Sequence, residues 1–236
     1  MNKFAKDFLN FSYKSPVSFY GVKNSVEILE QKGYKKLEEK DKWELKNKER
    51  YYVTINDSSL FAFEIGDKNP SETSFRIVGS HTDSPGIRIK PNPEICENGF
   101  LKLNIEVYGG PILNTWLDRP LALAGRVFTK GENSFSPKLH LVNINKALMI
   151  IPNLAIHQNR EVNKGIELNK QTDMLPTLAV IKEGFEKENY LLKLLAKEAK
   201  IKEEILDFEL YLYEYEKGNF VGANQELLSA SRIDNL

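Results

Sequence analysis

Cysteine and histidine are scarce in this sequence of 236 residues, which contains one cysteine, Cys96, and three histidines, His81, His140 and His157. A single cysteine excludes an internal disulfide framework and a cysteine-rich zinc finger. It also fits a reducing compartment, so we expect a cytoplasmic protein. Because histidines are so few, any metal site must include carboxylate ligands.

The sequence also lacks an excess of charge and a long apolar run. Lysine and arginine together number 33, as do aspartate and glutamate, so the chain has none of the positive excess typical of nucleic-acid binding. Residues 1–7 lack the apolar stretch of a signal peptide. The most apolar run, residues 147–156, is about half as long as a membrane span. We therefore expect neither nucleic acid nor a membrane as a partner.

The first third of the chain predicts an α/β arrangement. A helix is expected over residues 15–33, because a Ser-Pro pair opens the segment and a glycine follows its last apolar position. Two β-rich stretches, 51–54 and 59–65, are separated by Asn-Asp and predict a hairpin. Residues 74–79 predict a short buried strand. Helix, hairpin and strand together favour a mixed sheet with flanking helices.

A β-rich region follows the proline-rich stretch 91–93. Apolar and polar residues alternate over 101–107, which is typical of a half-buried strand. The other predicted elements are strands at 121–128, 138–144 and 207–215 and helices at 172–183 and 188–200. We expect residues 92–218 to form a β-rich domain inserted into a first domain made of residues 1–91 and 219–236.

The stretch 79–86 carries the first candidate site, because His81 and Asp83 follow the predicted strand directly. Side chains two apart on a strand point the same way. A carboxylate bonded to the far ring nitrogen orients a metal-binding histidine. Two interpretations are open from this pattern alone: His81 is a metal ligand oriented by Asp83, or Asp83 caps a turn and His81 lies near the surface.

Five segments, taken in order, resemble the aspartyl aminopeptidase and aminopeptidase I family of zinc metallopeptidases. Together they span most of residues 15–236. Any one of them would be a weak signal, and their shared order makes the resemblance strong. The segments are His81-Thr82-Asp83-Ser84-Pro85, Trp116–Val127, Ile151–His157, Asn169–Pro176 and Ser231–Leu236.

The resemblance implies a two-zinc peptidase domain interrupted by a β-rich dimerisation domain, acting on peptides within a large homo-oligomer. It implies that His81 ligates one zinc ion, that Asp83 supports this ligand and that Asp234 bridges both metals. It also implies that His157 reaches across a subunit contact towards a neighbour's substrate, whereas the residues around His157 alone favour a core histidine. Mixed histidine and carboxylate sites also accept cobalt or manganese.

In the family, the general-base glutamate and the remaining ligands lie beyond the position that matches Leu236. Our leading hypothesis is that these residues form the N-terminal portion of a two-zinc aminopeptidase and are inactive by themselves. The alternative is a short, catalytically inactive homologue that acts as an assembly or regulatory subunit. A small-molecule-binding domain unrelated to peptidases would leave the co-occurrence of the motifs unexplained. The sequence leaves open whether acidic or neutral N-terminal residues are preferred.

The resemblance also makes a geometric prediction. His81 and Asp234 are far apart in the sequence, yet ligands of one metal ion must lie within a few ångströms of each other. We therefore expect both residues at neighbouring carboxyl ends of strands in one sheet.

Overall fold

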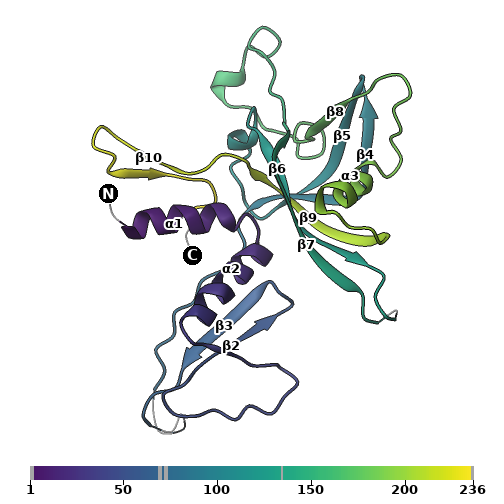
Figure 1. Cartoon of the computed structure of the whole chain (residues 1–236). Coiled ribbons are helices and arrows are strands. Elements are labelled where there is room, and N and C mark those ends of the chain that lie inside the picture. The colour runs from purple at the N-terminus through teal and green to yellow at the C-terminus, as the bar shows by residue number, and fades with distance from the viewer. Residues whose placement is uncertain (1–2, 69–70, 72–73, 134, 235–236) are drawn as a thin grey trace. The chain divides into compact units, whose positions relative to one another are not determined.

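The computed structural model describes residues 3–68, 71, 74–133 and 135–234, and it divides the chain into two units (Figure 1). Unit 1 combines Met1–Ser84 with Gly218–Leu236, and unit 2 is Pro85–Lys217. The sequence places the first boundary at residue 92 instead. The boundary differs because strand β4 (Gly86–Glu97) continues through both prolines of the proline-rich stretch. The role of the insertion in dimerisation stays a prediction.

Unit 1 is a mixed sheet with helices, as the sequence predicts, and the mixed α/β class is confirmed. Strand β1 runs parallel to β2, and β3 pairs with β2 in the antiparallel sense. A separate antiparallel pair, β10 and β11, belongs to the segment that returns to this unit. The elements are α1 (Lys3–Lys14), α2 (Ser18–Gln31), β1 (Lys35–Lys36), β2 (Arg50–Ile55), β3 (Ser59–Glu64), β10 (Asn219–Val221) and β11 (Leu227–Ser229).

Helix α2 ends where the sequence predicts but starts later. Gly33, with φ of 83°, follows the helix in the left-handed conformation that glycine adopts without strain. At the other end, Val17 and not Ser15 occupies the N-cap position, and its side chain makes no capping hydrogen bond. The Ser15 hydroxyl is used elsewhere, since it accepts a hydrogen bond of 2.9 Å from Asn24 Nδ2.

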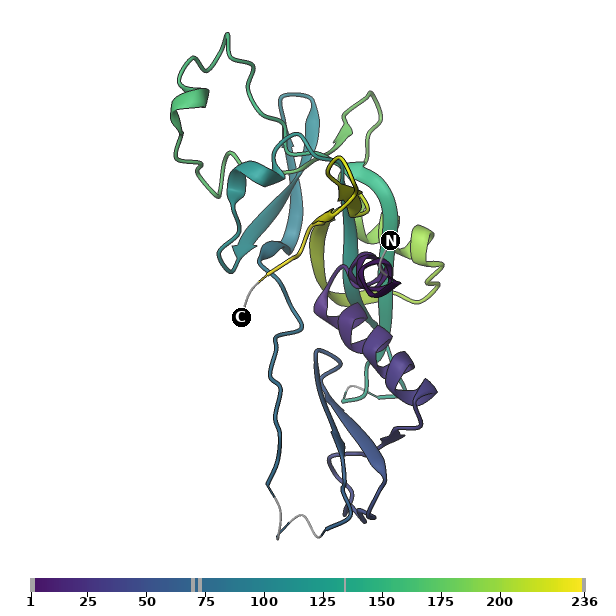
Figure 2. The ribbon, with the colours of Figure 1, turned by 90° about the vertical axis from the view of Figure 1, so that its left-hand side faces the viewer.

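The predicted hairpin is confirmed, whereas the predicted buried strand after it is wrong. Asn56 and Asp57 turn between β2 and β3 with φ of 53° and 54°. Residues 74–80 belong to no strand, and Ile77 and Val78 are 82% and 97% exposed. Figure 2 shows this stretch as an extended trace apart from the ribbons of β2 and β3. Apolar composition marks a potential strand, but a strand forms only where a backbone partner is available.

Unit 2 is built on an antiparallel sheet whose described strands lie in the order β7-β6-β9-β4-β5-β8. The prolines of β4 are tolerated because the register with β5 shifts between Ile89 and Glu94, so they lie at an irregularity. The other elements are β5 (Phe100–Tyr108), β6 (Leu121–Thr129), β7 (Lys138–Met149), β8 (Thr177–Val180), α3 (Tyr190–Ala199) and β9 (Ile205–Glu214).

The helix predicted at residues 188–200 is confirmed as α3, but the one predicted at 172–183 is wrong. Residues 177–180 form β8, which pairs with β5. Pro176 stands directly before this strand, and a residue preceding proline is disfavoured in the helical conformation. Tertiary pairing with the exposed edge of β5 therefore overrides the helical spacing of the apolar residues.

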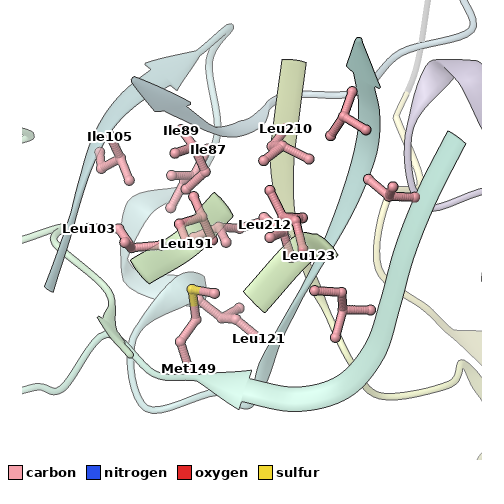
Figure 3. Packing of buried hydrophobic residues seen from close by; sticks show 14 of the residues in the cluster. Ile87, Ile89, Leu103, Ile105, Leu121, Leu123, Met149, Leu191, Leu210 and Leu212 are labelled. Atoms are coloured by element: carbon pink, nitrogen blue, oxygen red, sulfur yellow. The ribbon is translucent and has the colours of Figure 1, made fainter. Parts of the chain in front are cut away.

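The core of unit 2 lies between one face of the sheet and α3 (Figure 3). Side chains from β4, β5, β6 and β9 meet Leu191 and Leu195 of the helix, and all of these are almost fully buried. Strand β6 is the most buried strand, because it pairs along its length with β7 on one side and β9 on the other. This continuous pairing makes β6 sensitive to any change in backbone spacing.

Gly125 is the point of closest backbone approach in β6. A Cβ atom at this position would lie 2.0 Å from the carbonyl oxygen of Glu209 and 2.9 Å from the Cα of Leu210 on β9. Backbone atoms of a central strand cannot shift as easily as the end of a flexible side chain can. The glycine is therefore required by packing.

We expect Gly125→Ala to destabilise the chain by about 3 kcal/mol, because the added methyl group separates β6 from β9. Urea unfolding followed by circular dichroism measures the change. Gly110→Ala is the matched control in the same unit, since a methyl group at that position would have no atom within 4 Å. Gly110→Ala should change the free energy of unfolding by no more than about 0.5 kcal/mol. Equal effects of the two substitutions would show that the approach of β6 to β9 is not a constraint.

Candidate metal site

His81 and Asp83 lie on the extended stretch that ends unit 1 before the chain enters unit 2. The Nδ1 atom of His81 is 3.0 Å from Oδ1 of Asp83. An ionised carboxylate only accepts hydrogen bonds, so the Nδ1 atom carries the proton in this contact. The second ring nitrogen, Nε2, is left with its lone pair available. Asp83 thus fixes the tautomer that a metal ligand needs.

Asp234 approaches the same imidazole from the other side, since its Oδ2 atom lies 3.5 Å from Nε2 of His81. The two residues come together as the sequence predicts, but not at the strand ends it predicts. His81 lies outside any strand, and Asp234 follows β11, which belongs to a different sheet from β1–β3. Their roles as ligands stay predictions.

The geometry between Nε2 and Oδ2 fits a shared cation. Both atoms are acceptors when the proton is on Nδ1, so they repel unless a positive charge lies between them. Two zinc bonds of about 2.1 Å at a tetrahedral angle would separate the donor atoms by ~3.4 Å. The observed 3.5 Å matches that spacing. His81 and Asp234 would therefore hold zinc through these two atoms.

Two ligands do not complete a zinc site. Within the described part of the chain, no group of three or more histidine, cysteine, aspartate or glutamate side chains is arranged to hold a metal ion. Asp83 does not add a ligand here, because it faces the opposite ring nitrogen. A structural zinc ion takes four ligands and a catalytic one keeps three from protein, so further donors are required.

A pocket of about 370 Å³ adjoins these residues within unit 1. Its walls come from three parts of the sequence: α1 with the start of α2, the stretch 80–84, and the end of the return segment. Among its lining residues are Phe8, Phe11, Ser18, His81, Arg232 and Asp234.

Helix α1 and Arg232 are parts of this site that the sequence analysis missed. The Nη2 atom of Arg232 donates a hydrogen bond of 3.1 Å to the carbonyl oxygen of Ser12, near the C-terminal end of α1. Carbonyl groups at a helix end need such donors. The signal for the helix was present in Phe4, Phe8 and Phe11, which recur at helical spacing. No sequence pattern indicated that Arg232 would contact it.

His157 belongs to unit 2, whereas the other three site residues belong to unit 1. It is exposed, which contradicts the expectation of a core histidine from its apolar neighbours. Glu203, which could be mistaken for a glutamate ligand, also lies in unit 2. A hydrogen bond from Lys138 lowers the pKa of Glu203.

A comparison with protein families matches residues 11–236 to the aminopeptidase I zinc metalloprotease family, M18. The chain belongs to this family. The resemblance that the five ordered segments predict is thereby confirmed.

Curated M18 relatives and solved structures agree with this assignment. A probable M18 family aminopeptidase 2 of Clostridium novyi is 54% identical over 236 residues, covering 99% of this chain and 54% of the relative. The chain thus spans about half the length of the curated relatives it matches. The structure of Ape4 in complex with Nbr1 is similar with a TM-score of 0.90, at 35% identity over 98% of this chain and 47% of that one. The mApe1 dodecamer of S. cerevisiae gives a TM-score of 0.81, at 26% identity over 99% of this chain and 53% of that one.

We expect His81→Ala and Asp234→Ala each to remove zinc from the natural protein that contains these residues, because each substitution removes every donor atom of the side chain. Asp83→Asn should weaken zinc binding about 10- to 100-fold, because it removes the carboxylate that orients the imidazole. Bound zinc is measured by elemental analysis after dialysis against metal buffers. His157→Ala is the matched histidine control and should retain all its zinc. Full zinc occupancy in His81→Ala would remove His81 from the site.

Proposed function

We propose that the protein at its full length is a zinc-dependent aminopeptidase that removes N-terminal residues from peptides. The single observation that carries this proposal is the approach of Asp234 to the free ring nitrogen of His81, whose other nitrogen faces Asp83. Membership of the aminopeptidase I zinc metalloprotease family supports it.

The chain's own residues would act as follows. His81 would bind zinc through Nε2, Asp83 would hold the imidazole in that tautomer, and Asp234 would supply negative charge facing the cation. When bound, zinc supplies Lewis-acid activation of water and of the scissile carbonyl group. We propose two zinc ions per site, with Asp234 shared between them, and cobalt or manganese as substitutes.

The general base and the remaining ligands are proposed to lie in polypeptide outside residues 1–236. Hydrolysis at a two-metal centre needs several ligands and a group that carries a proton to the leaving amine. The described residues bring only His81 and Asp234 to the shared position. The five ordered segments resemble both aspartyl aminopeptidases and aminopeptidase I, so peptides with acidic and with neutral N-terminal residues are both tested.

Activity is tested with peptides that have free or acetylated N-termini. We expect zinc-dependent release of the first residue from the free peptide only, and a loss of at least about 100-fold in His81→Ala, because a ligand is removed. A chelator should abolish turnover, and added zinc should restore it. Residues 1–236 expressed alone should show no turnover. A natural protein that binds no zinc and hydrolyses no peptide would favour the assembly-subunit alternative.

We also propose that unit 2 mediates a homo-oligomer and that the protein acts in the cytoplasm. None of the helices in the described part of the chain has the length and apolar character needed to span a bilayer. The single cysteine supports a reducing compartment.

Leu154 and Ile156 of unit 2 are 57% and 49% exposed and lie close together in the sequence. A twofold contact buries one such apolar patch on both partners at once.

The dimer proposal predicts that Ile156→Glu weakens self-association at least about tenfold, because a charge would enter an apolar contact. Sedimentation of the full-length protein at micromolar concentration measures the change. Leu206→Glu is the control, since Leu206 is a comparably exposed leucine on a different part of unit 2. A wild-type protein that sediments as a monomer would contradict the proposal directly.

A further inference from the structure

His157 lies in a long loop of unit 2 that is held at both ends. The loop runs over residues 152–173 between two fully buried side chains, Ile151 and Met174. It contains a short 3-10 helix, Val162–Lys164, and otherwise turns and irregular backbone. Figure 2 shows it as a broad green loop extending from the sheet of unit 2.

Asp118 holds the beginning of this loop with two hydrogen bonds. Its backbone N–H donates to the carbonyl oxygen of Ile151 at 2.9 Å. Its Oδ1 atom accepts from the backbone N–H of Asn153, also at 2.9 Å. The residue between them, Pro152, has no N–H group, so Asn153 provides the first backbone donor of the loop. Asp118 therefore binds the chain on both sides of the proline.

The backbone of Asp118 has an uncommon conformation, which the two hydrogen bonds accompany. Its φ is 57°, in the left-handed region that aspartate and asparagine tolerate better than most residues. Such a conformation persists where the surroundings stabilise it. Here the stabilising contacts are those with Ile151 and Asn153.

Further hydrogen bonds lie on both sides of His157 in the sequence. The Oδ1 atom of Asn153 accepts from the N–H of Leu154 at 2.8 Å. The carbonyl oxygen of Ala155 then accepts from Gln158 N at 2.8 Å and from Asn159 N at 3.1 Å, which closes the turn around His157. The turn that contains His157 therefore begins two residues after the amide that Asp118 binds.

The other end of the loop is fixed independently. The Asn169 N–H donates to Oδ2 of Asp173 at 2.8 Å, and Lys90 Nζ donates to Oε1 of Gln171 at 2.9 Å. Loss of the Asp118 contact would therefore leave the loop attached at its far end. Only the part nearer to His157 would gain freedom.

We propose that Asp118 is a positioning residue that sets the orientation of His157 through the amide of Asn153. This inference rests on the proposed function and on the role that the family resemblance implies for His157, which is to reach the substrate of a neighbouring subunit. Asp118 itself does not touch the substrate in this proposal. Because a displacement of about 1 Å can cost up to 100-fold in rate, loosening the loop should reduce turnover measurably.

Two substitutions distinguish the effect of the Asp118 carboxylate on activity from the effect of its backbone conformation. Asp118→Asn keeps an oxygen acceptor and tolerates positive φ, so kcat/KM of the full-length protein should stay within about twofold of wild type. Asp118→Gly accepts positive φ without strain but lacks the acceptor, so kcat/KM should fall about tenfold. Asn98→Gly, at another positive φ in unit 2, controls for the added freedom of glycine. Hydrogen exchange at the Asn153 amide should accelerate only in Asp118→Gly.

A double-mutant cycle with His157→Ala tests whether Asp118→Gly lowers kcat/KM through His157. If Asp118 acts through His157, then Asp118→Gly causes no further loss in the His157→Ala background. An equal tenfold loss in both backgrounds would overturn the inference, as would full activity of Asp118→Gly alone. If His157→Ala itself keeps wild-type kcat/KM, the proposed role of His157 has failed, and the positioning role fails with it.

Discussion

Only a hydrogen atom fits as the side chain of Gly218, where the polypeptide re-enters unit 1. A Cβ atom there would lie 2.6 Å from Cβ of Ala230 and 2.7 Å from Cδ2 of Leu9 in α1. This close packing brings the return segment against the helix at the start of the chain. The contact of Arg232 with Ser12 then joins the same two segments, and Asp234 follows two residues later. The position of Asp234 beside His81 thus depends on backbone packing remote from the imidazole.

The two carboxylates near His81 have different origins and different tasks. Asp83 is two residues away, so an extended backbone is sufficient to bring it to Nδ1. Asp234 reaches Nε2 only after the whole of unit 2 has been inserted between them. The contact with Asp83 is local, and the contact with Asp234 is long-range; in the proposed site the first would orient the imidazole and the second would face the cation. Asp83 and Asp234 face opposite ring nitrogens, so only Asp234 lies beside the nitrogen that a metal ion would bind.

Two groups of exposed apolar side chains lie next to candidate site residues in the sequence. One is the extended stretch 74–80 of unit 1, and the other is formed by Leu154 and Ile156 in unit 2. Exposed apolar area carries a hydration cost of about 25 cal/mol per Å², so grouped residues of this kind indicate sites of contact. The second group neighbours His157 in sequence, so the proposed dimer would link association with the position of this histidine.

Local patterns in the sequence were sufficient for much of the fold. The glycine end of α2, the Asn-Asp hairpin and the alternating strands of unit 2 were all predicted, because each depends on neighbouring residues. The pairing of His81 with Asp83 was predictable for the same reason. The strand predicted at residues 74–79 and the helix predicted at 172–183 are wrong, since the conformation of both segments depends on whether a distant strand offers backbone partners.

The sequence by itself therefore determined which residue types were available for a metal site and which family the ordered motifs indicate. Only the tertiary structure decided that Asp234 faces the free nitrogen of His81, that Arg232 reaches α1 and that Asp118 holds the loop of His157. These contacts join residues separated by many positions. Their geometry follows from the packing of whole elements, and no periodicity or local motif encodes it.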